Sequence, residues 1–338
     1  MPNYRHITPV PLWVMNLTAF CMIISATLFL TDNVASNHRQ SILATNSLAS
    51  RELPELGVFG TNPFNGLLLE AKASIVYDVN RNRIIFGQNE NAQLPLASIT
   101  KLMTALVASE TLPPYTMIPI VPLTEEYDPR LIVGESWPLE TLISYTLLTS
   151  SNSGADSIAT AVAAYLDGTG TRNERLSSKS FVAAMNARAE TLGMKQTYFI
   201  NGSGLDLFTS TGGAYGSARD VALLLAHLLE QRPGLLSATV NESMSFTGPD
   251  GRIIEAKNTN TGVSGIPGIR ASKTGFTDLA GGNLAIAFDV SFGEPYIIVV
   301  MNSTQEGRFL DTEILTQATI DYLGSHLWGY ANVYQSTR

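Results

Sequence analysis

Strand-like segments begin and end the long C-terminal part of this chain, and helical segments lie between them. Residues 67–79 are rich in apolar and β-branched side chains, a turn follows at 80–82, and residues 83–88 resume the pattern, which predicts a β-hairpin. Near the end, residues 269–276, 283–290 and 296–303 predict three more strands. These distant segments favour one sheet built from both ends of the chain.

The middle of the chain has the spacing of apolar residues that is typical of helices. The segments in question are 97–110, 139–166 with a break at 150–154, 181–192, 217–229 and, after the last strand, 312–323. Short links between the last strands favour antiparallel pairing. The expected fold class is therefore α/β or α+β, with a mainly antiparallel sheet flanked by helices and a second, mostly helical lobe.

Composition excludes several classes of protein. Hydrophobic residues make up 45% and charged residues 15% of the 338 residues, which is enough for a sizeable core in one large domain or two ordinary ones. A net charge of −8 without a basic run argues against a nucleic-acid partner. The single cysteine, Cys21, excludes a disulfide within the chain, and the four histidines lack ligand spacing, so we expect no metal and no cofactor.

Residues 11–31 form an almost unbroken apolar run without a charge, long enough to cross a bilayer as a helix. Arg5 before the run and Asp32 after it favour a cytoplasmic N-terminus, residues 1–10, and an exported remainder. The alternative is a cleaved signal peptide, for which Asn33-Val34-Ala35 is a poor cleavage site. We therefore favour an uncleaved single-pass anchor in the cell membrane.

The rest of the chain divides by composition. Residues 32–65 are rich in Asn, Ser, Ala and Thr without periodicity, which indicates a polar linker. Residues 66–328 are expected to form the folded domain, and residues 329–338 a C-terminal tail.

Ser98 and Lys101 form an S-x-x-K motif at the start of the helix expected after Pro95. Residues at i and i+3 share one helix face, so the lysine amine can reach the serine hydroxyl. A serine hydroxyl is a weak nucleophile until a base takes its proton, and a lysine can be that base when burial or nearby cations lower its pKa. Free N–H groups at the helix start suit an oxyanion. The other interpretation is an ordinary solvated helix start.

Two more motifs follow in the chain. Residues 150–152, Ser-Ser-Asn, lie at the break between two helices, where a hydroxyl could relay a proton and an amide could hold a carbonyl. Residues 273–275, Lys-Thr-Gly, lie in a predicted strand, where a cation and a hydroxyl beside glycine suit an anionic group docked along the strand edge. Each motif alone also fits an ordinary loop or an edge strand. Their order and context together favour one shared site.

With these motifs the chain resembles the low-molecular-mass penicillin-binding proteins that act as D-alanyl-D-alanine carboxypeptidases, the serine peptidases that trim peptidoglycan stems. The resemblance runs from about residue 71 to residue 323. Beyond the motifs it is carried by ASIVYDVNRNRIIF, LASITKLMTALVA, GESWPLETLISYTLLTSSNSGAD, NGSGLD, SARDVALLLAHLL and IPGIRASKTGFTDLAGGNLA. It implies a β-lactamase/transpeptidase-like fold, a peptidoglycan substrate, and β-lactams as covalent inhibitors.

The resemblance also implies roles for the catalytic residues. Ser98 would be the acylated nucleophile, and Lys101 would be its general base. Ser150 would pass the proton to the leaving D-alanine, and Asn152 would bind the substrate amide.

The third motif is expected to bind the substrate. Lys273 and Thr274 would hold the terminal carboxylate, with Gly275 beside them on the strand edge. The backbone N–H groups of Ser98 and Phe276 would form the oxyanion hole. Arg308, just before the last expected helix, would add positive charge at the carboxylate site.

Three residues depart from the pattern of many relatives. Ser151 stands where many carry Gly, Phe276 where some carry His, and Ser203 where others carry His. None of these changes removes a catalytic group. The expected activity is that of a serine-type D-Ala-D-Ala carboxypeptidase; the alternatives are a peptidoglycan DD-endopeptidase with the same residues, a β-lactamase, and a membrane-tethered β-lactam sensor.

Overall fold

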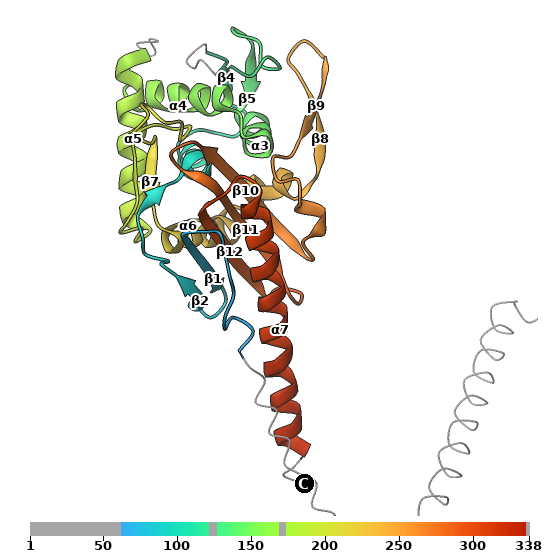
Figure 1. The fold of residues 1–338 in the computed structure, drawn as a ribbon. Helices are drawn as coiled ribbons and strands as arrows, with labels where there is room; N and C mark the ends of the chain where they lie inside the picture. The colour runs from blue at the N-terminus through green and yellow to red at the C-terminus, as the bar shows by residue number, and fades with distance from the viewer. Residues whose placement is uncertain (1–61, 122–126, 169–173, 336–338) are drawn as a thin grey trace, which may run out of the picture. The chain divides into compact units, whose positions relative to one another are not determined.

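The computed structural model describes residues 62–121, 127–168 and 174–335 (Figure 1). At its centre lies a five-stranded antiparallel sheet in the order β10-β11-β12-β1-β2. The strands are β1 (Ala73–Asp78), β2 (Arg83–Gln88), β10 (Ile269–Thr277), β11 (Gly281–Asp289) and β12 (Pro295–Ser303). Because β1 pairs with β12, the first hairpin and the last three strands form the single sheet that the sequence predicts.

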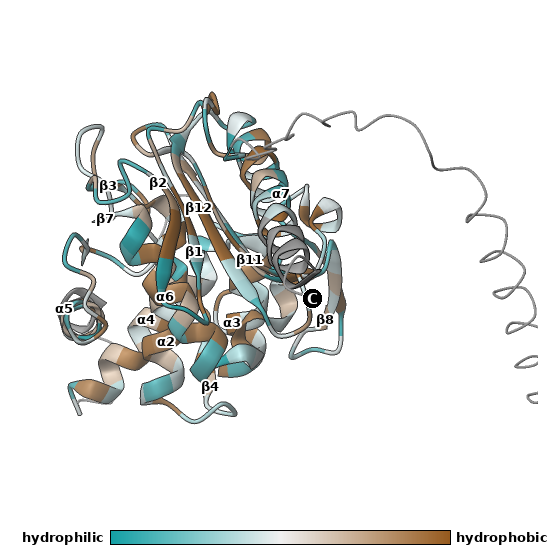
Figure 2. Cartoon of the chain, turned by 90° about the horizontal axis from the view of Figure 1, so that it is seen from below, coloured by the Kyte–Doolittle hydropathy of each residue, from teal (hydrophilic) through white to brown (hydrophobic). Residues whose placement is uncertain are grey.

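Along β1, β11 and β12 both faces of the sheet are buried, and different helices lie on the two sides (Figure 2). On β12, Ile297 and Val299 belong to the core that contains α6 (Ala218–Gln231), whereas Ile298 and Val300 belong to the core that contains α7 (Gly307–Gln335). Alternate residues of a strand point to opposite faces, so a strand covered on both sides reads as a continuous apolar run. This explains the segment YIIVVM.

The middle of the chain forms the helical lobe. It contains the short 3-10 helix η1 (Ala97–Thr100), α2 (Lys101–Thr111), α3 (Leu139–Thr149), α4 (Asn152–Leu166) and α5 (Glu174–Thr191). Every residue of α2 from 101 to 108 is buried, so the first two turns of this helix lie in the core without a solvent-facing side. The first residue of α2, Lys101, is therefore buried as well.

Several small elements were not expected from the sequence. They are the sheet of β3 (Leu94–Pro95), β7 (Ala214–Gly216) and β6 (Tyr198–Phe199), the pair β4 (Met117–Pro119) and β5 (Ser136–Pro138), the hairpin of β8 (Ser243–Thr247) and β9 (Ile253–Lys257), and the 3-10 helices η2 (Pro233–Val240) and η3 (Val263–Gly265). Arg252, between β8 and β9, holds this hairpin to the helical lobe through a 2.6 Å hydrogen bond from Nη2 to Oε2 of Glu135. Strands this short depend on tertiary partners rather than on local pattern.

The last helix begins earlier than the expected residue 312. The Gly307 N–H donates to Thr304 Oγ1 at 2.8 Å, and the Arg308 N–H donates to the Thr304 carbonyl at 3.2 Å. A threonine acceptor of this kind starts a helix. Arg308 therefore lies inside α7 rather than before it, which corrects the sequence prediction.

The expected N-terminal segment 1–10, the anchor 11–31, the linker up to residue 61 and the last three residues of the tail lie outside the described residues. Phe64, at the end of the expected linker, is buried and stacks on Phe86 with ring centroids 5.1 Å apart. Among the helices that are described, none combines the length and apolar character needed to span a membrane.

Candidate active site

Ser98 lies in η1, directly after a strained residue. Ala97 has a φ of +47°, in the left-handed region that a residue with a Cβ rarely adopts. This conformation turns the chain from β3 into η1, and the Ile99 N–H closes the turn on the Leu96 carbonyl at 3.2 Å. The side chain of Ser98 is half-buried at the start of a helical segment, as the sequence predicts, although this first turn is a 3-10 turn.

Lys101 connects the first motif with the second. Its side chain is fully buried. The Nζ atom donates to Ser98 Oγ at 2.7 Å, to Asn152 Oδ1 at 2.8 Å and to the Ser203 carbonyl at 2.7 Å. The amine is thus held within proton-transfer distance of the serine hydroxyl.

The second motif reverses the chain between two helices. Ser150, which ends α3, has a φ of +59°, and Ser151 begins α4 by accepting a hydrogen bond from the Gly154 N–H at 3.2 Å. Ser151 is therefore the N-cap of α4, which is a structural role. The turn places Asn152 against Lys101 and Ser150 against the third motif.

Lys273 of β10 connects the third motif with the second. It is 2% exposed, and its Nζ donates to Ser150 Oγ at 2.8 Å and to the Thr274 carbonyl at 2.7 Å. Burial, reinforced by the positive charges of Lys101 and Arg308, holds the pKa of Lys273 well below its usual range. A carboxylate bound beside this amine would favour the charged form and form an ion pair with it.

The edge of β10 runs past the nucleophile. This strand pairs with β11 on one side and ends the sheet on the other. A Cβ added at Gly275 would lie 2.9 Å from the Leu96 carbonyl oxygen and 3.1 Å from the Ser98 backbone nitrogen, so only glycine allows the strand to approach η1 this closely. The next residue, Phe276, is 42% exposed.

Arg308 supports the same strand from α7. It is buried, and its Nη1 donates to the Gly275 carbonyl at 2.9 Å. On the other side of the motif, the hydroxyls of Thr274 and Thr259 are 2.6 Å apart. The residues expected from the three motifs are thus brought together, and Arg308 lies directly behind the third.

Asn283 of β11 holds the sheet to the loop before Ser98, and no local pattern in the sequence indicated this role. It is fully buried, and its Nδ2 donates to the Pro95 carbonyl at 3.0 Å and to the Leu96 carbonyl at 3.1 Å. Its Oδ1 accepts from the Asn302 N–H at 2.8 Å.

Asn283→Leu is expected to lower the free energy of unfolding by about 3 kcal/mol, because it leaves these buried backbone groups without partners. Urea unfolding measures the change. Asn91→Leu, at an exposed position, is the control and is expected to stay within about 0.5 kcal/mol of the wild type. A loss no larger than that of the control would contradict the role of Asn283.

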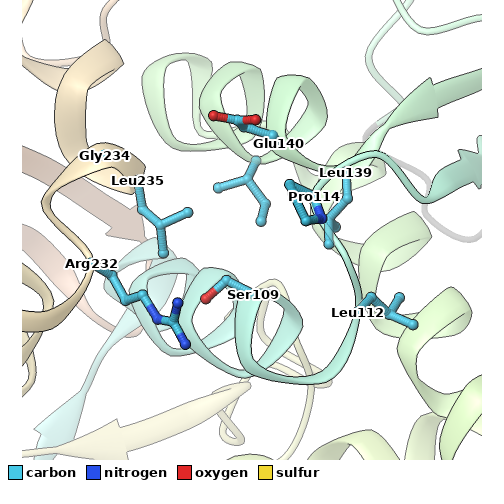
Figure 3. A pocket seen from close by; sticks show the side chains of 9 residues that line it. Ser109, Leu112, Pro114, Leu139, Glu140, Arg232, Gly234 and Leu235 are labelled. Carbon is cyan, nitrogen blue, oxygen red and sulfur yellow. The ribbon is translucent and has the colours of Figure 1, made fainter.

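A separate pocket of about 260 Å³ lies between the end of α2, the start of α3 and the start of η2 (Figure 3). Leu112, Pro114, Leu139 and Leu235 give it apolar walls. None of the three motifs contributes to this pocket. Within the described ranges, no three His, Cys, Asp or Glu side chains are grouped so as to hold a metal ion.

Known proteins share both the sequence and the fold of this chain. At the sequence level it is 29% identical to the D-alanyl-D-alanine endopeptidase of Pseudomonas aeruginosa, over 70% of this chain and 72% of that protein. It is 27% identical to a D-alanyl-D-alanine carboxypeptidase of Bacillus subtilis, over 62% of this chain and 51% of that protein. Among solved structures, ampicillin-bound penicillin-binding protein D2 from Listeria monocytogenes matches with a TM-score of 0.63 and 28% identity, over 75% of this chain and 98% of that one.

A sequence model of one family matches residues 62–305, a range that contains all three motifs. The description of that family is D-alanyl-D-alanine carboxypeptidase. The matched range covers most of the chain and begins where the described structure begins. The chain therefore belongs to the D-alanyl-D-alanine carboxypeptidase family of serine peptidases.

Proposed function

We propose that this protein is a serine-type D-Ala-D-Ala carboxypeptidase that removes the terminal D-alanine of peptidoglycan stem peptides. The observation that carries the proposal is the chain of hydrogen bonds across the three motifs. Lys101 Nζ bonds Ser98 Oγ and Asn152 Oδ1, and Lys273 Nζ bonds Ser150 Oγ. A nucleophile, a base, a proton relay and an anion site thus meet in one place.

In the first half of the reaction, Ser98 Oγ attacks the carbonyl carbon of the D-Ala-D-Ala amide while Lys101 takes the hydroxyl proton. The oxyanion that forms is stabilised by the backbone N–H groups of Ser98 and Phe276. Ser150 relays the proton that Lys101 took to the leaving nitrogen, the C–N bond breaks, D-alanine departs, and Lys101 is again a neutral amine. Water then attacks the acyl-enzyme and releases the shortened stem with Ser98 restored.

The substrate would lie along the free edge of β10. An extended peptide can pair with an exposed strand edge through main-chain hydrogen bonds. This places its terminal carboxylate near Lys273 and Thr274, with Arg308 adding positive charge from behind the strand. Asn152, the first residue of α4, would bind the substrate amide.

A β-lactam presents a strained amide to the same serine, so we expect it to acylate Ser98 as a covalent inhibitor. The penicillin-binding fold and the ampicillin-bound Listeria structure support this expectation.

The second candidate activity is that of a DD-endopeptidase, because relatives with that name match over about as much of the chain as the carboxypeptidases. Mass spectrometry of two substrates separates the activities: a monomeric pentapeptide stem and a cross-linked stem dimer. Our proposal predicts D-alanine release from the monomer by the wild type and none by Ser98→Ala. Cleavage of the dimer alone would assign the protein to the endopeptidases.

We also propose that the enzyme works outside the cytoplasm, tethered to the cell membrane by residues 11–31. The support is the apolar run itself and a substrate that belongs to the cell wall. Fractionation of cells that express the full chain tests this. The enzyme should stay with the membrane after a salt wash and should be degraded by protease added to spheroplasts; release as a shorter soluble form would indicate a cleaved signal peptide.

A further inference from the structure

Asp156 is a half-buried acidic side chain that the proposed mechanism does not use. It lies on α4 four residues beyond Asn152, so the two side chains share one face of the helix. Its Oδ2 atom is shielded from solvent and has no hydrogen-bond partner among the described residues. A buried carboxylate oxygen without a partner is costly and rare in folded proteins, which points to a use for it.

Asp156 shares its surroundings with Lys101, the proposed general base. The charge of Lys101 and the hydroxyl of Ser203 both act to lower the pKa of the Asp156 carboxyl and so favour its ionised form. The Ser203 carbonyl and Asn152 Oδ1 in turn accept hydrogen bonds from Lys101 Nζ. Asp156, Ser203 and Asn152 therefore form one polar cluster around the Lys101 amine.

Burial raises the pKa of Asp156 to about 6, while the charge of Lys101 and the Ser203 hydroxyl act in the opposite direction. From α2 the charged group that faces this carboxyl is Lys101, and from the loop after β6 it is the uncharged Ser203. Within the part of the chain that the structure describes, no other charged group affects Asp156. The carboxyl is thus coupled to one partner, the amine beside Ser98.

We propose that Asp156 is a positioning residue for Lys101 whose carboxylate provides the counter-charge for the ammonium that forms during acylation. The proposal rests on the acyl-serine function proposed above. When the Ser98 O–H bond breaks, a new N–H bond forms at Lys101 Nζ, and a positive charge appears in a buried place. The Asp156 carboxylate offsets that charge and neither gains nor loses a proton in the step.

The test is the pH profile of acylation by a fluorescent penicillin in the wild type, Asp156→Asn and Asp220→Asn. Without the negative charge, the Lys101 amine is a weaker base. The midpoint of the acidic limb in Asp156→Asn is therefore expected to fall by about one pH unit and the plateau rate by about threefold. Asp220 is a matched control, because it is buried on α6 and accepts hydrogen bonds from the Gln196 N–H and the Thr197 hydroxyl.

The midpoint does not depend on the fraction of folded protein, so it separates an electrostatic role from a structural one. A midpoint in Asp156→Asn equal to that of the wild type would overturn the proposal, as would an equal shift in Asp220→Asn. A wild type that is not acylated at any pH would instead overturn the proposed function.

A second measurement does not need Asp156→Asn to fold. Carbon-13 NMR of protein labelled at the aspartate carboxyls is expected to show one resonance that titrates near pH 6 and moves when Ser98 is acylated. Ser203→Ala keeps the carbonyl that binds Lys101 and removes the hydroxyl, so the midpoint of that resonance should rise. A resonance that does not respond to acylation would count against the coupling.

Discussion

Replacement of Lys101 by methionine is expected to slow the acylation of Ser98 by roughly 10³-fold. The Lys101 amine lies 2.7 Å from the Ser98 hydroxyl and is buried, so water cannot easily take its place as base. Methionine fills similar space with an apolar chain and removes the proton acceptor. Stopped-flow measurement of labelling by a fluorescent penicillin gives the rate, and thermal unfolding verifies that the variant is folded.

The matched control for this prediction is Lys195→Met, the same replacement at an exposed position. It removes one positive charge from the protein and leaves the motifs untouched, so its acylation rate should equal that of the wild type. A Lys101→Met protein that is folded and is acylated within tenfold of the control would show that another group serves as the base.

Gly204→Ala is expected to lower the free energy of unfolding by at least about 3 kcal/mol and to abolish acylation. Gly204 has a φ of +81°, and a Cβ at this position would lie 1.9 Å from the carbonyl oxygen of Ala97. Because the clash is with a backbone atom of Ala97, the residue before Ser98, it can be relieved only if the backbone moves. Urea unfolding and penicillin labelling measure the two effects.

Gly251→Ala separates backbone strain from this steric contact. Gly251 has a φ of +83°, and a Cβ there meets nothing within 4 Å. The same unfavourable φ without a clash should cost about 1 kcal/mol and leave acylation unchanged. Equal losses in the two variants would mean that the contact with Ala97 is not important.

The sequence predicted the large elements of the fold because their patterns are local. The hairpin of β1 and β2, the last three strands and the break between α3 and α4 each follow from periodicity and turn residues within a short segment. A single sheet shared by both ends of the chain was also predicted, whereas the pairing of β1 with β12 within it was not. The hairpin of β8 and β9 was missed, although its two five-residue strands pair with each other and the Gly-Pro-Asp-Gly at 248–251 is a local turn signal.

The motif residues of the site were also predictable, since each motif lies within a few residues of sequence. Lys101 reaches Ser98 because residues three apart share one side of a helical segment. The order of the motifs favoured one shared site, but no spacing in the chain indicated that Lys273 would contact Ser150.

Other residues of the site lacked any local signal. Asn283 is one polar residue in an apolar strand, and its use depends on a loop 188 residues earlier in the chain. Asp156 follows the second motif on the same helix, and the groups that affect its pKa, Lys101 and Ser203, come from distant parts of the sequence. Contacts of this kind are fixed by tertiary packing, which a single sequence does not display.

Mass spectrometry of the purified protein after exposure to a penicillin tests whether Ser98 is the acylated nucleophile of a D-alanyl-D-alanine peptidase. We expect one added penicilloyl group on the peptide that contains Ser98, no adduct in Ser98→Ala, and D-alanine release from a pentapeptide stem by the wild type alone. An adduct on another residue, or folded wild-type protein that forms no adduct, would contradict this assignment.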